Sequence, residues 1–515
     1  MNKQLLLGDE AIAMGAIHAG LSGVYAYPGT PSTEITEFIQ KKAPQIRSRW
    51  CTNEKTAMEA ALGMSYAGKR ALVCMKHVGM NVCADAFVNA AITGIQGGLV
   101  VLAADDPSMH SSQNEQDSRF YGTFAMVPIF EPSNQQEAYD MTMQAFAFSE
   151  QMKLPVLLRV VTRLAHSRAA VQTGEALPQN PLQPASGRDW VLLPAIARRR
   201  YEALIGKQPA LVEASNRRTQ VEAGGKRGIV ACGIAYNYVK EAGTDDSILK
   251  LNQYPLPESA IRDFAARCER ILVVEDGQPV VEQQLKALLG NGYPVSGRLD
   301  GALPRTGELT PDNVATALGK AGQDSGQQAQ NIAPRPPQLC PGCGHRDVYK
   351  ALGDIVSEYP QARVFGDIGC YTLGALPPFN ALASCVDMGA SITMAKGAAD
   401  AGLHPAIAVI GDSTFTHSGM TGLLDAVNDH SAITVIISDN LTTAMTGGQD
   451  SAGTSKFEAI CLGLGVEPEH LHVVVPTRPN LPEIERILRE EIEYKGVSVI
   501  IPRRECMQTL KRHKK

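Results

Sequence analysis

Short runs of apolar and β-branched residues alternate along the chain with longer amphipathic stretches. The apolar runs are predicted strands, and the clearest are Gly23–Tyr27, Arg70–Met75, Gly98–Ala103, Val156–Val161, Arg270–Asp276, Arg363–Phe365, Ala406–Ile410, Ile433–Ile437 and Val497–Ile501. Strands that alternate with helices are typical of parallel sheets with crossover connections. The pattern therefore predicts an α/β protein.

Two stretches have the composition of helices. The segment NEKTAMEAALGMSYAG, residues 53–68, is rich in alanine, begins with a capping-type asparagine and ends at glycine. A second helix is expected around Leu193–Glu213, after the polar, proline-rich segment Gln172–Arg188. The first of these helices connects two predicted strands, as a crossover helix does.

A chain of 515 residues is too long for one hydrophobic core and predicts about three domains. A second α/β region begins at Gly228, and a third follows a run rich in Gln, Ser and Pro that has the composition of a solvated linker. We expect domains at residues 1–185, 186–320 and 339–515, with a linker at 321–338.

Composition excludes several classes of protein. The net charge of −5 gives no electrostatic reason to expect nucleic acid or an anionic membrane as a partner. The apolar runs are shorter than the roughly 20 residues that span a bilayer, and the N-terminus lacks the pattern of a secretory signal. Eleven cysteines in this length do not make a disulfide scaffold. We expect a cytoplasmic protein.

Polar residues with possible chemistry follow the predicted strands at their carboxyl ends. They occur in the segments YPGTPS, CMKH, LAADD, FGDIGC, VIGDS and ISDN. Open parallel sheets bind ligands along this edge. The sequence therefore predicts a ligand site there.

A candidate magnesium site lies in the last third of the chain. Asp412 follows one predicted strand in the segment GDS, and Asp439-Asn440 follow the next. Carboxylate and amide oxygens at neighbouring strand ends can hold one octahedral magnesium ion together with diphosphate oxygens, although such residues also serve as turn formers. The spacing resembles the thiamine-diphosphate motif, which has glycine where this chain has Ser413 and asparagine where it has Asp439. The segment TTAMTGGQ, residues 442–449, extends the resemblance.

Thiamine-diphosphate enzymes use a glutamate that hydrogen-bonds the aminopyrimidine ring and favours its imino tautomer, which deprotonates the thiazolium carbon. Glu54, just inside the first predicted helix, matches this residue. Glu59 lies on another face of the same helix. The alternative for Glu54 is a first-turn glutamate that the helix dipole favours.

Four cysteines form a candidate iron–sulfur site. LCPGCGH places Cys340 and Cys343 in a tight Cys-x-x-Cys turn, and no second pair for zinc lies nearby. Cys370 and Cys506 complete an order that resembles the proximal 4Fe–4S cluster of pyruvate:ferredoxin oxidoreductases. A redox Cys-x-x-Cys with two core cysteines is the alternative.

These motifs, with DDPSMHSSQNEQDSR and GDSTFTHSGM, resemble the large subunit of indolepyruvate:ferredoxin oxidoreductase in their order along nearly the whole chain. The resemblance implies three doubly wound domains: a pyrimidine domain, a transketolase-C-like domain and a diphosphate domain. It also implies a dimer of large subunits, a smaller β subunit and a ferredoxin as partners. The implied cofactors are thiamine diphosphate, Mg²⁺ and a 4Fe–4S cluster.

The same resemblance assigns residues to roles. Magnesium would be held by Asp412, Asn440 and the Thr442 carbonyl. The remaining cofactor-binding positions would be Gly366, Asp367, Gly369, Gly389, Gly411, Ser413 and Met445. Candidates that touch the 2-oxoacid are Thr30, His77, His110 and Arg119, of which the last three could equally be ordinary polar residues.

The expected reaction is the oxidative decarboxylation of indolepyruvate or another arylpyruvate with coenzyme A, with electrons passed to ferredoxin. Met445 replaces an asparagine of the pyruvate enzymes and suits a larger substrate or core packing. A non-oxidative decarboxylase or carboligase is the alternative, and a binding module without turnover is a second. The chain ends without the ferredoxin domain that usually follows in the family, so we expect a separate electron carrier, which the basic segment 511–515 could help to dock.

Overall fold

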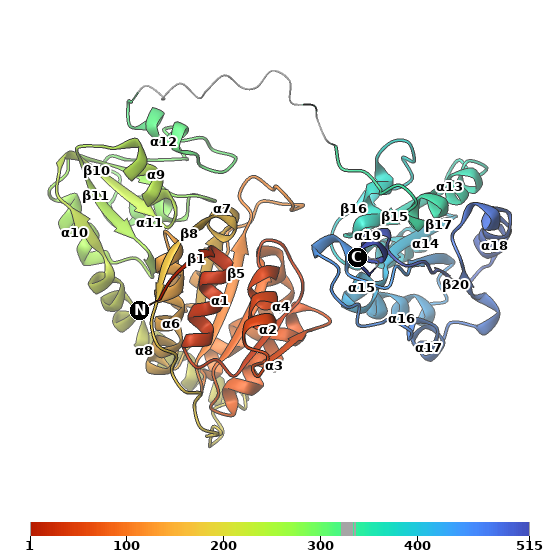
Figure 1. Cartoon of the computed structure of the whole chain (residues 1–515), viewed down its shortest axis with the longest axis horizontal. Helices are drawn as coiled ribbons and strands as arrows, with labels where there is room; N and C mark the ends of the chain where they lie inside the picture. The colour runs from red at the N-terminus through yellow and green to blue at the C-terminus, as the bar shows by residue number, and fades with distance from the viewer. Residues whose placement is uncertain (1, 321–332, 334–335, 514–515) are drawn as a thin grey trace. The chain divides into compact units, whose positions relative to one another are not determined.

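The computed structural model describes residues 2–320, 333 and 336–513. The chain divides into two compact units, residues 1–330 and 331–515. Figure 1 shows the elements of each unit. Most of the predicted linker, residues 321–338, lies outside the described residues.

The first unit contains a seven-stranded sheet in the order β12-β6-β7-β5-β4-β2-β3. Its strands are β2 Gly23–Ala26, β3 Arg47–Trp50, β4 Ala71–Lys76, β5 Leu99–Asp105, β6 Ile129–Phe130, β7 Val156–Val161 and β12 Gln253–Tyr254. All pairings are parallel except that of β12 with β6. Strands β1 (Asn2–Leu7) and β8 (Arg168–Thr173) form a separate antiparallel pair.

Helices cover both faces of this sheet. They are α1 Gly8–His18, α2 Thr33–Lys42, α3 Glu54–Tyr66, α4 His77–Thr93, α5 Arg119–Ala125, α6 Gln135–Met152 and α7 Thr162–His166. Alternate residues of β4 point to opposite faces, so Leu72 and Cys74 join the core under α1, α2 and α6, whereas Val73 and Met75 join the core under α3 and α4. Burial on both faces explains why these strands are continuously apolar.

A second sheet of the first unit has the order β14-β13-β10-β11-β9. Its strands are β9 Gln220–Glu222, β10 Gly225–Cys232, β11 Asp246–Leu251, β13 Arg270–Val274 and β14 Val295–Ser296, and the helices of this region are α8 Pro194–Arg218, α9 Ala235–Ala242, α10 Glu258–Ala265, α11 Val280–Leu289 and α12 Pro311–Ala317. Residues of both sheets share the same hydrophobic clusters, and β12 from this region pairs with β6. The two sheets therefore form one compact unit.

The second unit contains a six-stranded, fully parallel sheet in the order β16-β15-β17-β18-β20-β19. Its strands are β15 Arg363–Gly366, β16 Ser384–Cys385, β17 Ala406–Gly411, β18 Ile433–Ser438, β19 Leu471–Val474 and β20 Val497–Pro502. Its helices and turns are α13 Gly344–Val356, η1 Cys370–Ala375, α14 Ala390–Asp400, α15 Asp412–Thr414, η2 Phe415–Gly419, α16 Met420–Asn428, η3 Ala444–Thr446, α17 Phe457–Gly463, η4 Pro468–His470, η5 Arg478–Asn480, α18 Leu481–Glu493 and α19 Met507–His513.

The α/β class and the parallel sheets that the sequence predicts are confirmed. The predicted helix after Asn53 is α3, and the Asn53 side chain caps it by accepting a hydrogen bond from the Thr56 amide at 2.9 Å. The predicted helix around Leu193–Glu213 is α8.

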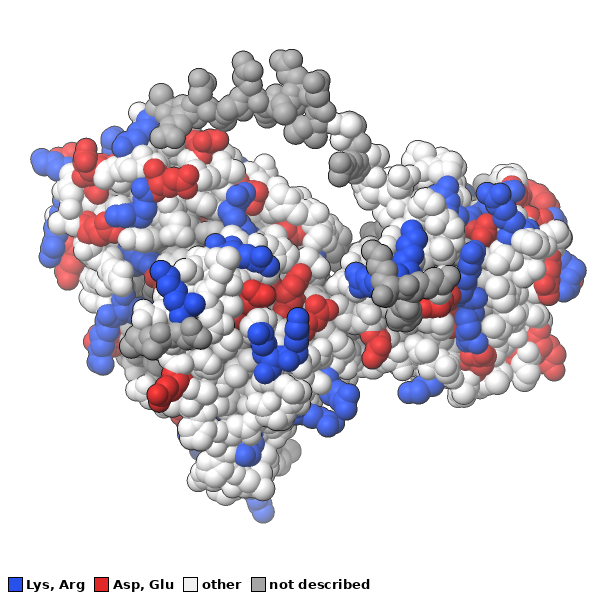
Figure 2. Space-filling model, viewed as in Figure 1, with Lys and Arg blue, Asp and Glu red and all other residues white. Residues whose placement is uncertain are grey.

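The distribution of charge and the character of the helices bear on whether nucleic acid or a membrane is a partner. On the face drawn in Figure 2, acidic and basic side chains are interspersed over both units, with uncharged areas between them. Among the described residues, no helix combines the length and the apolar character that crossing a membrane requires.

Candidate active site

The carboxyl edge of the six-stranded sheet carries the predicted magnesium ligands. Strands β17 and β18 are parallel neighbours, and Asp412 follows one while Asp439 and Asn440 follow the other. A helical run begins at Asp412 and continues through a π-helical turn at Phe415–Gly419 into α16. Such π turns are frequent at functional sites, and a helix N-terminus favours anions.

Asp412 is a buried carboxylate held by backbone amides. Its Oδ1 accepts a hydrogen bond from the Ser413 amide at 2.8 Å, and its Oδ2 accepts one from the Thr442 amide at 3.1 Å. Burial, with a contribution from the charge of Asp439, raises the pKa of Asp412 to about 7. A divalent cation beside this carboxylate would favour its ionised form.

The turn after β18 joins the two predicted ligands. The Thr442 amide also lies 3.2 Å from Asn440 Oδ1, so Asp412 and Asn440 share one donor. Leu441, which lies between Asn440 and Thr442, has a φ of 63°, a left-handed conformation that costs a bulky residue about 1–2 kcal/mol. The fold maintains this strain at the point where the ligands converge.

Asp439 has a different role from Asn440. Arg503 Nε donates to its Oδ2 at 2.6 Å, and the Leu441 amide donates to its Oδ1 at 3.2 Å. The Arg503 guanidinium also forms two hydrogen bonds to Glu458, at 2.9 and 2.8 Å. Asp439 is therefore occupied by structural partners, and the donor set of Asp412 and Asn440 is the one that fits magnesium.

Asp367 is held by side chains and amides of its own unit. It is fully buried and accepts hydrogen bonds from the Tyr371 hydroxyl, from Ser391 Oγ at 2.6 Å, and from the amides of Ser391 and Gly389, both at 3.2 Å. Burial raises its pKa to about 6. Asp367 therefore positions the start of α14, and its expected contact with the cofactor stays a prediction.

The expected cofactor-binding glycines pack against other parts of the protein. A Cβ on Gly411 would lie 2.5 Å from the Tyr371 ring, and one on Gly369 would also collide with that ring. Gly389 has a φ of 95°, and a Cβ there would lie 2.7 Å from Ser418 Cβ. Gly366 similarly faces Leu382 at 2.7 Å. These four glycines allow close packing at the sheet edge.

Ser413 and Met445 lie in the segments that follow Asp412 and Asn440. Thr443 Oγ1 lies 3.0 Å from Ser413 Oγ, which ties the two segments together. Met445 is 56% exposed within its unit. Core packing inside this unit, one of the two alternatives for Met445, is therefore wrong.

All four predicted cluster cysteines line one cavity. Its volume is about 200 Å³, and Cys340, Cys343, Cys370 and Cys506 share it with Asn440. The Cys343 amide donates to the Cys340 carbonyl at 3.1 Å, which forms the tight turn, and the Cys506 amide donates to the Asn440 carbonyl at 3.1 Å. The cysteine cavity is thus adjacent to the predicted magnesium ligands.

The four thiols influence one another electrostatically. Burial, and then the neighbouring thiolates of Cys506, Cys343 and Cys340, raise the pKa of Cys370 to about 12. Metal–thiolate bonds stabilise the ionised form of such thiols. The four thiols therefore lie in one electrostatic environment, beside the predicted magnesium ligands.

Glu54 occupies the first turn of α3 in the first unit and is buried. Its side chain packs on Gly79 of α4, where an added Cβ would lie 2.7 Å from Glu54 Cγ and Oε1. Glu59 is instead exposed and paired with Lys55. The structure separates the two glutamates as the helical spacing predicts.

His77 and Thr30 lie at the carboxyl edge of the seven-stranded sheet, and His110 lies in the loop after β5. Thr30 is half-buried in the loop after β2, and His77 is buried at the start of α4. Both ring nitrogens of His77 lack a hydrogen-bond partner. His110 has a half-exposed side chain, and its Nε2 lies 3.3 Å from Glu308.

Lys76 was not among the predicted site residues, although it lies in the segment CMKH. Its buried Nζ donates to the Ser111 carbonyl at 2.6 Å and lies 3.9 Å from Asp106. Burial lowers its pKa to about 8, and the charge of Asp106 opposes that shift. Its side chain faces Gly29, beside Thr30. A lysine directly before the candidate His77 was the available signal.

The structure places Arg119, an expected ligand of the substrate carboxylate, among carboxylates of its own unit. Its side chain is fully buried, with Nη2 at 2.5 Å from Asp117 and Nη1 at 2.8 Å from Glu275. The Gln278 carbonyl also accepts a hydrogen bond from Nη2 at 2.9 Å. The guanidinium group of Arg119 is thus bound by two carboxylates and a backbone carbonyl, and it connects the two sheets of the first unit.

Comparisons with known protein families match one segment in each unit. The family described as pyruvate flavodoxin/ferredoxin oxidoreductase, thiamine diphosphate-binding, matches residues 14–184. The C-terminal thiamine pyrophosphate-binding domain of thiamine pyrophosphate enzymes matches residues 367–501. Glu54 lies in the first match, and Asp412 and Asn440 lie in the second.

Several similar proteins that match nearly the whole chain share one name. Indolepyruvate oxidoreductase subunit IorA of Archaeoglobus fulgidus is 39% identical over 98% of this chain and 86% of the relative. The protein of that name from Methanothermobacter marburgensis is 38% identical over 98% of this chain and 87% of the relative. Among solved structures, a 2-oxoglutarate:ferredoxin oxidoreductase from Magnetococcus marinus matches with a TM-score of 0.53 and 17% identity, over 62% of this chain and 65% of that chain. At this identity the structural match shows a shared fold.

Proposed function

The chain belongs to the IorA family of indolepyruvate oxidoreductase subunits, and we propose that it catalyses the oxidative decarboxylation of an arylpyruvate with coenzyme A and passes the electrons to ferredoxin. It is a thiamine-diphosphate-dependent oxidoreductase. The substrate, coenzyme A and the electron acceptor are the parts that we propose.

The observation that carries the proposal is the cavity that four cysteines share with Asn440. Oxidative decarboxylation releases two electrons that need an acceptor near the reacting carbon. An iron–sulfur cluster held by these thiols would accept them one at a time. A non-oxidative decarboxylase or carboligase releases no electrons and has no use for four converging thiols.

The residues of the second unit fit magnesium and a diphosphate. Asp412 and Asn440 offer oxygen ligands around one backbone turn, and the Thr442 carbonyl would be the third protein ligand. The amides at the start of the helix at Asp412 would favour the diphosphate charge. When bound, thiamine diphosphate supplies the electron sink for decarboxylation.

Residues of the first unit would handle the proton and the substrate. Glu54 would accept a hydrogen bond from the pyrimidine ring and hold it in the reactive tautomer, and its burial excludes water from that contact. Thr30 and His77 remain proposed substrate contacts, and His110 is retained as a rim residue. We propose Lys76 in place of Arg119 as the cation for the 2-oxoacid carboxylate. The exposed Met445 leaves room for an aromatic side chain.

The names of the relatives, which are oxidoreductase subunits, support a partner subunit, and the other partners are part of our proposal. A smaller β subunit would complete the enzyme, a ferredoxin would receive the electrons, and two large subunits would form the dimer. The test therefore uses the chain together with its partner subunit.

Anaerobic assays of the Cys340→Ala variant test the proposal, with Cys385→Ala as the matched control. Cys385 is an exposed cysteine of the same unit that does not line the cavity. Wild type and control should contain about four cluster irons per large subunit in excess of those of the partner subunit, and should reduce a viologen dye with indolepyruvate and coenzyme A. Cys340→Ala should lose both. Release of an aldehyde at an undiminished rate by a wild-type protein without iron would instead support the non-oxidative decarboxylase.

A further inference from the structure

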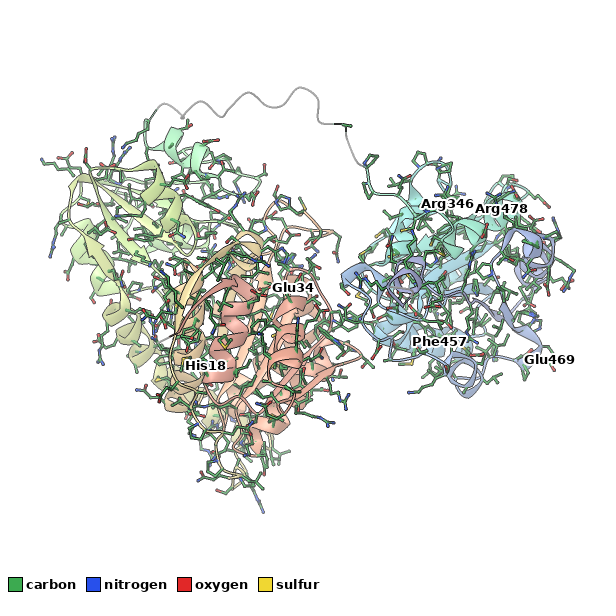
Figure 3. All side chains as sticks on the ribbon, viewed as in Figure 1. His18, Glu34, Arg346, Phe457, Glu469 and Arg478 are labelled. Atoms are coloured by element: carbon green, nitrogen blue, oxygen red, sulfur yellow. The ribbon has the colours of Figure 1, made fainter. Side chains whose placement is uncertain are left out.

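Three side chains from three helices of the first unit meet outside the residues assigned above. Asp9 lies in the first turn of α1, Glu34 in the first turn of α2, where Figure 3 labels it, and His166 at the end of α7. One potential ligand atom from each lies within 4.8 Å of the other two, and no other such group of His, Cys, Asp or Glu occurs in the part of the chain that the structure describes.

Asp9 is unusual for a buried carboxylate. Its side chain is 0% exposed, and neither of its oxygens has a hydrogen-bond partner. An ionised carboxylate in such surroundings costs several kcal/mol unless a cation compensates it. Burial, and then the negative charges of Glu34 and Glu10, raise the pKa of Asp9 well above its ordinary value.

The other two side chains lie at ion-pair distance from each other. His166 Nε2 lies 3.6 Å from Glu34 Oε1, and this contact raises the pKa of His166 and lowers that of Glu34. The distance is close to the separation of about 3.4 Å between two ligands that lie about 2.1 Å from a tetrahedral metal. Glu34 Oε2 is buried and also lacks a partner. Both carboxylates of the cluster therefore carry buried oxygens without a hydrogen-bond partner.

The backbone brings these side chains together. A Cβ on Gly8 would overlap the carbonyl of Leu164, so glycine lets the start of α1 pack directly on α7. The Gly8 amide donates to the Ser167 carbonyl at 3.1 Å, next to His166. Glu34 follows the loop that carries Thr30 by a few residues. The cluster thus connects three helices, one of which begins just after the loop at the carboxyl edge of the sheet.

We propose that Asp9, Glu34 and His166 bind a divalent first-row transition-metal ion that ties α1, α2 and α7 together. Two carboxylates and one imidazole suit Zn²⁺, Mn²⁺ or Co²⁺. The side chains of His166 and Glu34 are 37% and 39% exposed, so water can complete the coordination shell. The alternative is a protonated Asp9 without a metal, and an experiment can separate the two.

The test compares Co²⁺ binding by the full-length wild-type chain with that of Asp9→Asn and His166→Gln, in the absence of thiamine diphosphate. Glu10→Gln is the matched control, because Glu10 neighbours Asp9 in α1 but accepts only from the Leu7 amide at 2.9 Å. Equilibrium dialysis counts the bound ions, and the thiolate-to-cobalt charge-transfer band identifies ions at cysteines. Sites elsewhere in the chain are common to all four proteins and cancel in the comparison.

Wild type and Glu10→Gln should bind one more Co²⁺ per chain than Asp9→Asn, without added thiolate absorption. His166→Gln should bind it at least about tenfold more weakly. Saturating Co²⁺ should raise the melting temperature of the first two proteins by a few degrees and leave that of Asp9→Asn unchanged. Equal stoichiometry and equal thermal shifts in all four proteins would overturn the proposal. His166→Gln changes an exposed side chain, so it decides the question even if Asp9→Asn folds poorly.

Discussion

The contact between Gly79 and Glu54 offers a direct test of the proposed catalytic glutamate. A Cβ at position 79 would lie 2.7 Å from Glu54 Cγ and Oε1 and 2.9 Å from Cδ. Ordinary van der Waals contacts begin at 3.4 Å, so Gly79→Ala should displace the Glu54 side chain by about 0.7 Å. Because these three atoms belong to a flexible side chain, the backbone need not move.

The magnitude follows from this displacement. A misplacement of about 1 Å can cost about 100-fold in rate, so we expect Gly79→Ala to slow catalysis by roughly 10- to 100-fold. This corresponds to about 1.4–2.7 kcal/mol of lost transition-state stabilisation. The folded state should lose little stability, since alanine is favoured over glycine in a helix by about 1 kcal/mol and offsets part of the clash.

The assay measures hydrogen–deuterium exchange at the thiazolium carbon of the bound cofactor, together with kcat/KM. Gly63→Ala is the matched control, because a Cβ added at Gly63 in α3 would meet no atom of another described element within 4 Å. That control should be slightly stabilised and fully active. Glu54→Gln should bind the cofactor and lose the exchange. Wild-type exchange rates in Gly79→Ala would refute the assignment of Glu54 as the proton-transfer residue.

Three further predictions concern other parts of the structure. Arg119→Met should destabilise the first unit by about 3–5 kcal/mol in urea unfolding, because it leaves buried carboxylates without their cation. Arg163→Met should cost less than about 1 kcal/mol, because the Arg163 side chain is 40% exposed and pairs with Glu308 at 2.6 Å. Unchanged stability of Arg119→Met together with a raised KM would restore Arg119 as a substrate ligand. Burial raises the pKa of Asp412 to about 7, and magnesium needs the ionised form of this carboxylate. The affinity for magnesium and thiamine diphosphate should therefore fall about tenfold per pH unit below about pH 7. Calorimetry that finds constant affinity between about pH 6 and 8 would contradict this. Chelation of iron from the reconstituted protein should abolish dye reduction and leave cofactor binding intact, and a chelated protein with full dye reduction would exclude the cluster as electron acceptor.

The sequence alone determined the features that depend on local order. Continuously apolar runs specify strands that are buried on both faces, and residues that follow such runs necessarily lie at the carboxyl edge of a parallel sheet. Asp412 and Asn440 could be placed in this way. Asn53 could be recognised as a cap because capping depends on only a few neighbouring residues.

Only the tertiary structure decided which distant residues meet. Cys506 reaches the cavity of Cys340 because its amide binds the Asn440 carbonyl, a contact between segments that sequence distance does not encode. An arginine such as Arg119 can bind the carboxylate of a substrate, but this side chain pairs with Glu275 and other carboxylates of the same chain. Asp9 and His166 are far apart in the sequence of the first α/β region. They meet because glycine at position 8 lets α1 pack directly on α7. Burial and pairing of a charged side chain are properties of the packed molecule, since each depends on every element that surrounds it.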